Sequence, residues 1–333
     1  MHRPCLAERD NYIQLDLQAH ARENAAVMSQ HEATQRHLHI DRRQMLARSA
    51  GLAAIGGLGL ANLAPGRDNV SQQPVVKKGD IRQSLVYWCF SKYWDVEKAC
   101  QIAKQLGIPA IEIVAPEHWP ILKKYGLVCS LASSHGFDKG LNNPKYWPMC
   151  HEKLRTAIDA CAEFRFPNVI TFTGFREDIP DDVGMKNCVE GLKQIVGYAE
   201  KNKVNLCLEM LNSRVDIEMK GHPGYQGDHT DYCIEIIKKV GSPRLNLLFD
   251  IYHVQIMEGD IITRIRQHKD YIGHYHTAGN PGRIELDDRQ EINYPPIMRE
   301  ILKTGYKGYV AQEFIPTRDP LEGLTEAVRL CDV

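Results

Sequence analysis

From residue 84 onward, short apolar runs alternate with amphipathic stretches of ten or more residues. This alternation predicts repeated strand–helix units and a parallel sheet. The expected strands are Leu85–Phe90, Ala110–Val114, Val128–Ser133, Asn168–Thr173, Asn205–Leu211, Leu245–Ile251, Ile272–Thr277 and Gly308–Phe314. The intervening helices are expected to begin near Val96, His118, Lys145, Val183, Thr230, Ile261 and Pro296, with a last helix after Pro320.

Four expected helices end in glycine just before a strand, at Gly107, Gly126, Gly241 and Gly305. A glycine at this position supplies the left-handed residue that commonly terminates a helix. Eight strands and eight helices within about 250 residues fit a closed barrel better than an open doubly wound sheet. No Gly-rich turn of the dinucleotide-binding kind follows the first strand. The sequence therefore predicts an α/β fold, a (β/α)₈ TIM barrel, over residues 81–333.

The charge balance limits the partners of this chain. Its formal net charge is −1, so it lacks the basic character that nucleic-acid-binding domains normally show. Hydrophobic residues make up 43% and charged residues 25%, as in an ordinary globular enzyme. We expect a small polar molecule as the substrate and no nucleic-acid partner. A homo-oligomer is compatible with this composition.

Residues 1–80 differ from the rest. Arg42 and Arg43 precede a Gly/Ala-rich apolar run at residues 50–61, and this order resembles a twin-arginine export signal. The run is shorter than the roughly 20 residues that a membrane span needs. We therefore expect a leader, a polar linker at residues 65–80, and export to the periplasm or cell envelope without a stable membrane span. The alternative is that Arg42 and Arg43 belong to the start of an ordinary helix. Without a functional leader, the protein would be cytoplasmic.

The 10 cysteines are scattered and form no CxxC or zinc-type pair. Cys161 and Cys207 lie inside apolar runs, where a cysteine behaves as a small hydrophobic residue. We expect buried free thiols. Unpaired cysteines are unusual in an exported protein, but the twin-arginine route carries proteins that are already folded.

The last four expected strands each carry a candidate metal ligand near their carboxyl end. These residues are Glu209, Asp250, His276 and Glu313. A charged group inside an apolar strand is costly to bury without a partner, and one such residue alone would more often form a core ion pair. Four at matching depth, at the end of the barrel where active sites lie, predict one shared divalent cation.

Three carboxylates and one imidazole form an oxygen-rich ligand set. Such a set favours Mg²⁺ or Mn²⁺, with Co²⁺ or Zn²⁺ as alternatives. A structural zinc site would instead use cysteines in a closed tetrahedron. None of the cysteines is needed for the predicted site.

Several segments of this sequence resemble the hydroxypyruvate isomerase family of xylose isomerase-like TIM barrels, which is related to the ketose 3-epimerases. The matching segments are Glu209-Met210-Leu211-Asn212, residues 249–255, residues 276–283 and Gln312-Glu313-Phe314. The order of residues 250–253, Asp-Ile-Tyr-His, and then residues 291–294, Glu-Ile-Asn-Tyr, is specific to this family. The resemblance extends over residues 83–333. It implies that Glu209 and Glu313 both bind the metal and exchange protons with the substrate. It also implies that His135, His253 and Arg283 contact the substrate.

The resemblance implies interconversion of hydroxypyruvate and 2-hydroxy-3-oxopropanoate (tartronate semialdehyde) through an enediolate. His276 leaves the substrate open, because some hydroxypyruvate isomerases carry Gln at this position whereas ketose epimerases carry His. The alternatives are therefore a ketose 3-epimerase or another sugar isomerase, and a non-catalytic exported protein that binds sugar acids. An endonuclease-IV-like barrel would need further ligands and a basic face. Trp88, Trp94 and Trp119 are expected either at the pocket mouth or in the barrel core.

Overall fold

The computed structural model describes residues 74–333. Arg42, Arg43 and the apolar run at residues 50–61 lie outside the described residues, so the leader and its export stay predictions. Within the described residues, no helix is both long and apolar enough to cross a membrane.

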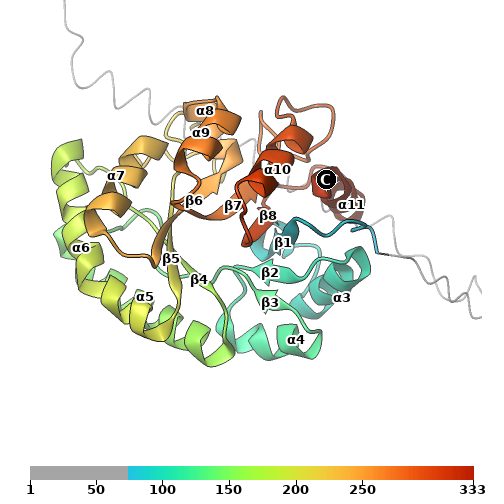
Figure 1. Cartoon of the computed structure of the whole chain (residues 1–333), viewed down its shortest axis with the longest axis horizontal. Helices are drawn as coiled ribbons and strands as arrows, with labels where there is room; N and C mark the ends of the chain where they lie inside the picture. The colour runs from blue at the N-terminus through green and yellow to red at the C-terminus, as the bar shows by residue number, and fades with distance from the viewer. Residues whose placement is uncertain (1–73) are drawn as a thin grey trace, which may run out of the picture. The chain divides into compact units, whose positions relative to one another are not determined.

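Eight parallel strands form a curled sheet at the centre of the described residues (Figure 1). The strands are β1 (Arg82–Val86), β2 (Ala110–Glu112), β3 (Val128–Cys129), β4 (Asn168–Thr171), β5 (Asn205–Glu209), β6 (Leu245–Asp250), β7 (Ile272–Thr277) and β8 (Tyr309–Gln312). Their order is β3-β2-β1-β8-β7-β6-β5-β4. A parallel bridge between Ala132 and Val169 joins the two ends of this order. The predicted (β/α)₈ barrel is confirmed.

Helices surround the sheet, as the ring of coiled ribbons in Figure 1 shows. They are α2 (Tyr87–Phe90), α3 (Val96–Leu106), α4 (Trp119–Lys124), α5 (Trp147–Phe164), α6 (Asp181–Asn202), α7 (Thr230–Val240), α8 (Ile251–Met257), α9 (Ile261–His268), α10 (Tyr294–Lys303) and α11 (Pro320–Cys331), with 3₁₀ turns at Pro116–His118 and Pro144–Tyr146. The predicted starts of α3, α7 and α9 are confirmed. The short helix α8, directly after β6, was not predicted.

The first strand ends earlier than the sequence predicts. It stops at Val86, and the apolar residues Tyr87–Phe90 form the helical turn α2. Phe90 is fully buried there, stacked on Trp94 at 5.1 Å between ring centroids and edge-on to Phe314 at 5.5 Å. A short apolar run suits a buried helical turn as well as a strand, so the run alone could not distinguish them.

The predicted helix-terminating glycines are confirmed. The φ angles of Gly107, Gly126, Gly241 and Gly305 are +84°, +66°, +74° and +80°. The backbone N–H of Gly107 donates to the carbonyl of Lys104 and so satisfies an otherwise unpaired acceptor at the end of α3.

Nine cysteines lie in the described residues, and all nine are buried free thiols. The prediction is confirmed for them, while Cys5 lies outside the described residues. Burial raises the pKa of Cys100 to about 11 and that of Cys161 to about 12. These thiols therefore stay protonated and pack as small apolar side chains.

The packing of the barrel begins a few residues before the expected boundary at residue 80. Val75 and Val76 pack against the hydrophobic core, and the N–H of Val76 donates to the carbonyl of Leu106. The carboxylate of Asp332, just after α11, accepts hydrogen bonds from the backbone N–H groups of Lys77, Lys78 and Gly79. These contacts attach the segment before β1 to the end of the chain.

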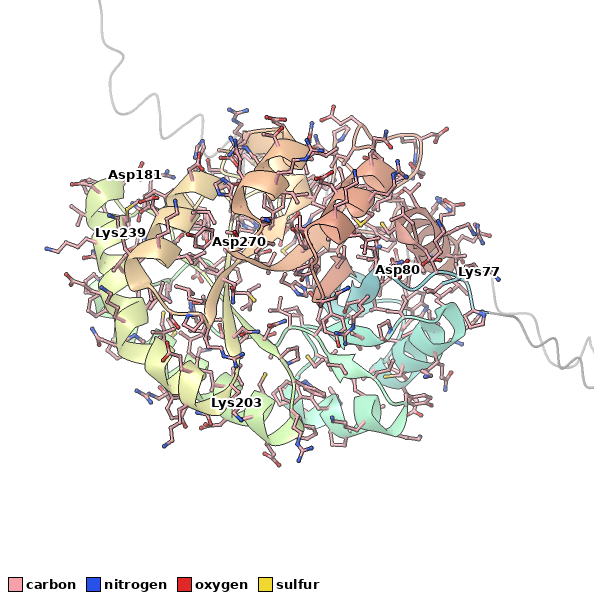
Figure 2. All side chains as sticks on the ribbon, viewed as in Figure 1. Lys77, Asp80, Asp181, Lys203, Lys239 and Asp270 are labelled. Atoms are coloured by element: carbon pink, nitrogen blue, oxygen red, sulfur yellow. The ribbon has the colours of Figure 1, made fainter. Side chains whose placement is uncertain are left out.

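Most charged side chains are exposed on the outer helices and loops. Asp181, Lys203, Lys239 and Asp270 are examples, labelled in Figure 2. A second set is at most 5% exposed and lies near the carboxyl ends of the strands, namely Glu112, Glu209, Asp250, Arg283 and Glu313. Burial of several charges in one place is costly unless they compensate one another or bind a ligand.

Candidate metal centre

The four predicted ligands converge at the carboxyl ends of β5 to β8. Glu209 and Asp250 are the last residues of β5 and β6, His276 lies on β7, and Glu313 follows β8. Asp250 pairs with His276 in the sheet register, which sets the two at equal depth. One ligand atom from each of the four residues lies within 4.8 Å of the others. Parallel strands end at one rim of the barrel, so the sequence spacing translates into this cluster.

Asp250 has one oxygen occupied by the backbone and one directed into the cluster. It caps the N-terminus of α8, where its Oδ1 accepts from the N–H of Tyr252 at 2.8 Å and of His253 at 3.3 Å. Its Oδ2 is buried and has no hydrogen-bond partner among residues 74–333. The short helix therefore fixes the carboxylate and leaves one oxygen as a ligand.

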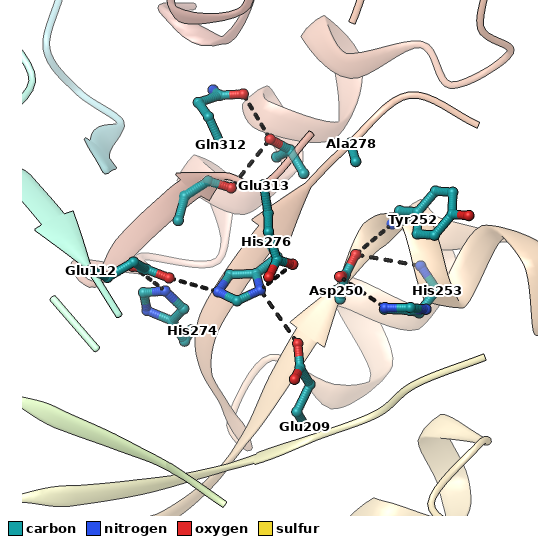
Figure 3. Close-up of polar contacts among 12 residues, drawn as sticks. Glu112, Glu209, Asp250, Tyr252, His253, His274, His276, Ala278, Gln312 and Glu313 are labelled. Carbon is teal, nitrogen blue, oxygen red and sulfur yellow. Dashed lines mark hydrogen bonds and ion pairs between the residues drawn. The ribbon is translucent and has the colours of Figure 1, made fainter. Parts of the chain in front are cut away.

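The ligand atoms fit a cation. Glu209 Oε1, Asp250 Oδ2 and His276 Nδ1 are all buried without a hydrogen-bond partner in the described part of the chain. His276 Nδ1 lies 3.3 Å from Glu209 Oε1 and 2.8 Å from Glu313 Oε2, as drawn in Figure 3. Buried polar atoms are rarely left unpaired, and a divalent ion would satisfy all three at once.

The electrostatics also indicate missing positive charge. Burial, followed by the charge of Glu313, raises the pKa of Asp250 to about 8. Burial likewise raises the pKa of Glu209. For Glu313 burial acts in the same direction, but the charges of Arg283 and His276 outweigh it and lower its pKa well below the usual value. A cation bound among these groups would favour the ionised form of each carboxylate.

A fifth acidic residue, Glu112 at the end of β2, fixes the orientation of His276. Its Oε1 accepts from His276 Nε2 at 2.7 Å. Its Oε2 accepts from His274 Nε2 at 2.9 Å and from the hydroxyl of Ser130 at 2.6 Å (Figure 3). Nε2 of His276 donates to Glu112, so Nδ1 faces the carboxylate cluster. Burial lowers the pKa of His276, but the charges of Glu313 and Glu112 outweigh it and raise that pKa, so a bound cation would displace the Nδ1 proton. Carboxylate–histidine pairs of this kind orient metal-binding imidazoles.

A cavity of about 240 Å³ opens beside the cluster. Glu209, His276, Glu313 and Arg283 line it, so three of the four candidate ligands face the space that a small molecule can enter. A site with mostly apolar walls and a few convergent polar groups is typical of small-molecule binding.

Residues 101–332 match the family model described as "Xylose isomerase-like TIM barrel". The chain belongs to this family. A mouse protein provisionally named hydroxypyruvate isomerase is 36% identical over 262 residues, which cover 72% of this chain and 91% of the mouse protein. The hydroxypyruvate isomerase of Escherichia coli K12 is 34% identical over 136 residues, covering 41% of this chain and 50% of that protein. The 2-oxo-tetronate isomerase of Cupriavidus necator is 33% identical over 150 residues, which cover 44% of this chain and 55% of that protein. These relatives indicate an isomerase.

Solved structures support the same fold. A family 2 AP endonuclease from Brucella melitensis superposes with a TM-score of 0.66 at 20% identity, covering 73% of this chain and 97% of that one. A D-psicose 3-epimerase superposes with a TM-score of 0.57 at 17% identity, and the match covers 74% of this chain and 90% of the epimerase chain. At these identities the likeness concerns the fold alone.

The three predicted substrate contacts have different surroundings. Arg283 lines the cavity, and its guanidinium donates to Glu313 Oε2 at 2.6 Å and to the carbonyl of Met219 at 2.7 Å. His135 also lines the cavity. Its Nδ1 faces the carbonyl of Gly136 and must donate, so its Nε2 accepts from the Thr171 hydroxyl. Both polar atoms of His135 are thus used within the protein.

His253 lies behind the ligands. Its Nδ1 accepts from the N–H of Asn212 at 3.0 Å, and its Nε2 lies 3.5 Å from Asp250 Oδ2. It is fully buried and does not line the cavity. The direct substrate contacts proposed for these three residues stay predictions.

Sequence reasoning missed Glu112, His274 and His222, and left Trp88 open. Trp88 lines the cavity and its Nε1 donates to Glu313 Oε1 at 3.1 Å, whereas Trp94 and Trp119 are buried in the core. A signal for His274 was present in the sequence. Side chains two residues apart on a strand point to the same face, so His274 shares a face with His276. Glu112 ends a strand as the other carboxylates do, and that position was a usable signal. His222 lies in a loop, where no sequence pattern indicated that it would line the cavity.

Proposed function

We propose that this protein is a metal-dependent isomerase that moves a carbonyl group between neighbouring carbons of a small hydroxy-carbonyl compound. We propose hydroxypyruvate as the substrate from the names of its relatives. Tartronate semialdehyde is the compound that results when its carbonyl moves to the neighbouring carbon. The observation that carries the reaction class is the buried cluster of Glu209, Asp250, His276 and Glu313, of which Glu209, His276 and Glu313 line a small cavity.

Glu209 and Glu313 are suited to transfer the proton. They come from β5 and from the end of β8, and a carboxylate oxygen of each faces Nδ1 of His276 (Figure 3). One carboxylate removes a proton from the hydroxymethyl carbon, and the electron pair forms a carbon–carbon double bond in an enediolate. A proton then returns to the neighbouring carbon, while the hydroxyl proton moves to the other oxygen. Substrate and product have the same composition, so no electron acceptor is needed.

The positively charged groups of the site would stabilise the enediolate. A divalent ion held by the four ligands would supply charge next to the two adjacent oxygens. Arg283 holds Glu313 in place through its 2.6 Å contact, and Glu112 keeps His276 oriented. These fixed groups need no reorganisation during the reaction.

A ketose 3-epimerase is the second candidate. It would use the same two glutamates but return the proton to the opposite face of the same carbon. His276 favours this candidate, because the resemblance assigns histidine at this position to the epimerases. A non-catalytic binding protein for sugar acids is a third candidate, which only a turnover assay distinguishes.

The test is a turnover panel with Mn²⁺ or Mg²⁺ in ²H₂O. Hydroxypyruvate, tartronate semialdehyde, D-fructose and D-psicose are each incubated with the metal-loaded protein, and products are followed by NMR. We expect conversion of hydroxypyruvate with deuterium at the reacting carbon, abolished by a chelator and restored by metal. Conversion of the ketoses alone, with inversion at carbon 3, would favour the epimerase. Absence of turnover on all four would contradict an isomerase of this class.

We also propose that residues 1–80 direct export through the twin-arginine route. The support is the pair Arg42-Arg43 before the apolar run at residues 50–61. Replacement of both arginines by lysine should leave the precursor inside the cell, measured by fractionation of the full-length chain. Arg67→Lys in the linker is the matched control, and unchanged export of the double variant would refute the signal.

A further inference from the structure

Three histidines line the cavity beside the metal cluster, and one of them, His222, has no hydrogen bond from its ring to any residue among residues 74–333. His276 donates through Nε2 to Glu112 and faces the ligand carboxylates with Nδ1. His135 uses both of its ring nitrogens within the protein. Buried polar groups are rarely left without a partner. The imidazole of His222 therefore has a hydrogen bond to offer to a molecule in the cavity.

The ring of His222 is held in place by its neighbours. Its centroid lies 4.3 Å from that of Phe137, with 54° between the planes, and 5.9 Å from that of His253, with 47° between the planes. Nε2 of His253 in turn lies 3.5 Å from Asp250 Oδ2, so His222 packs one residue away from a candidate metal ligand. The side chain of His222 is only 6% exposed. A donor that is fixed in this way needs no reorganisation when charge develops on a substrate.

The loop between β5 and α7 places His222 at the cavity. Asn212, at the start of this loop, accepts from the N–H of His222 through its carbonyl at 2.8 Å, and its side-chain amide donates to the carbonyl of Lys220 at 2.9 Å. Gly221 lies between these two residues and has no room for a side chain, because a Cβ atom would lie 2.1 Å from the carbonyl oxygen of Val215. The loop is thus closed on itself directly before His222.

The same loop is tied to the charged groups of the site. Arg283 donates to the carbonyl of Met219 at 2.7 Å and to Glu313 Oε2 at 2.6 Å. Burial, followed by the charge of Arg283, lowers the pKa of His222 to about 4. The ring of His222 is therefore uncharged at neutral pH and carries one N–H donor and one free lone pair.

An uncharged donor suits one oxygen of the proposed substrate better than the others. The carboxylate of hydroxypyruvate is charged throughout the reaction, and the permanent charge of Arg283 is the better partner for it. The carbonyl oxygen gains negative charge only when the enediolate forms. A hydrogen bond from a neutral N–H strengthens as its acceptor becomes charged. Such a bond stabilises the transition state more than the bound substrate, and this difference is what accelerates a reaction.

We propose that His222 is a further catalytic residue, whose imidazole N–H donates a hydrogen bond to the carbonyl oxygen of the substrate as that oxygen becomes part of the enediolate. The imidazole keeps its proton, and the two glutamates still move the proton between the carbons. This inference rests on the proposed function for the identity of the substrate, and it adds a substrate contact from the loop between β5 and α7.

Substitutions of His222 distinguish a hydrogen bond from packing. His222→Phe keeps an aromatic ring against Phe137 but removes both nitrogens. His222→Gln and His222→Asn remove the ring but keep an amide donor at the reach of Nε2 and of Nδ1. With saturating Mn²⁺, kcat for hydroxypyruvate should fall about 100-fold in His222→Phe with little change in KM, as for the loss of one oxyanion donor. At least one of the two amide variants should recover about tenfold of this loss.

Ile217→Gln is the matched control, because Ile217 belongs to the same loop, is 56% exposed and does not line the cavity. Its kcat and KM should equal those of the unaltered protein. A packing role for His222 predicts the opposite order of variants, with His222→Phe the most active of the three. That order, a near-normal kcat in His222→Phe, or a rise in KM without a loss of kcat would overturn the inference.

Binding of oxalomonohydroxamate, ⁻OOC–CO–NHOH, separates this inference from the reaction. Its two neighbouring oxygens copy those of the enediolate, and calorimetry on the Mn²⁺-loaded protein requires no turnover. We expect His222→Phe to weaken this binding about tenfold or more, and Ile217→Gln to leave it unchanged. If hydroxypyruvate is not converted, the proposed function fails, while weaker binding to His222→Phe would still support the contact. Equal affinity of the unaltered protein and His222→Phe would overturn the contact, whether or not hydroxypyruvate is converted.

Discussion

The two halves of this barrel carry different parts of the site. The second half, β5 to β8, supplies all four ligand residues, Glu209, Asp250, His276 and Glu313. The first half supplies Glu112 at the end of β2 and apolar side chains that line the cavity, such as Phe137 after β3 and Phe172 after β4. Chemistry is concentrated in one half, and the surroundings that orient and select are concentrated in the other.

This division explains which changes the site tolerates. Alteration of a ligand changes a charged, buried network, whereas alteration of an apolar lining side chain changes only the shape and polarity of the cavity. Members of one barrel family can therefore share a metal cluster while they differ in substrate, because the loops and strand ends of the barrel vary independently. The comparison predicts a large loss of turnover for substitutions of ligands in the second half and an intermediate loss of metal affinity at Glu112. It predicts a small loss of stability where the two halves are tied together.

The largest effects are expected for Glu209→Gln and Glu313→Gln. Each substitution keeps the shape and one ligating oxygen but removes the basic carboxylate. Turnover should fall about 100-fold or more even at saturating Mn²⁺, the usual contribution of a general acid or base. Steady-state kinetics across a metal titration measures this separately from metal affinity.

Asp250→Asn provides the contrast within the same half. Its carboxylate is proposed as a ligand alone, so excess metal should recover part of the lost activity. Near-normal turnover of either glutamine variant with metal in excess would refute the two-glutamate mechanism but leave the metal site standing. If all three variants lose turnover equally and excess metal restores none of them, the glutamates would have no role beyond that of Asp250.

An intermediate effect is expected for Glu112→Gln in the first half. Without the carboxylate, the orientation of His276 and the protonation of its Nε2 are held less firmly. Loss of such an outer partner typically lowers metal affinity about 10- to 100-fold. Free Mn²⁺ measured by electron paramagnetic resonance gives this affinity without any substrate.

Ser130→Ala is the matched control, because the Ser130 hydroxyl donates to Glu112 Oε2 and not to His276. Its Mn²⁺ affinity should stay close to that of the unaltered protein. If Glu112→Gln and Ser130→Ala change the affinity equally, Glu112 acts through general packing and not through His276.

The sequence was most informative where local chemistry follows a simple period. Alternating apolar runs predicted the eight strands, and the residues Glu209, Asp250, His276 and Glu313 were recognisable because strand ends share one rim. The structure brings these four together. The first strand was placed too late because the apolar Tyr87–Phe90 segment fits a buried helical turn equally well.

The first half of the site could not be derived in the same way. Nothing in the sequence indicates that Ile113 adopts a left-handed conformation, since isoleucine normally favours extended backbone. The contact between Glu112 and His276 joins residues 164 positions apart, on strands separated by β1 and β8. Such contacts depend on barrel closure, which residue patterns predict only as an architecture.

The smallest effect is expected at Asp332, which ties the beginning of the first half to the end of the second. Its carboxylate accepts three backbone N–H groups, from Lys77, Lys78 and Gly79, at 2.6, 2.9 and 2.8 Å. Partial burial opposes ionisation, but these three donors outweigh it and lower the pKa of Asp332 below its usual value. Asp332→Asn should cost about 1 kcal/mol of unfolding free energy, since the group stays largely solvated.

The pH dependence of this loss follows from the sign of the shift. A carboxyl with a lowered pKa in the folded state stabilises the fold above its unfolded pKa of 3.8, and this contribution disappears as pH falls through the folded value. The difference in stability between the unaltered protein and Asp332→Asn should therefore be constant from about pH 5 to 7 and shrink below about pH 4. Urea unfolding at several pH values measures it, and Mn²⁺ affinity should not change. A difference that grows on acidification would contradict the ionised clamp, and a simultaneous loss of Mn²⁺ affinity would mean that the tie between the halves also shapes the metal centre.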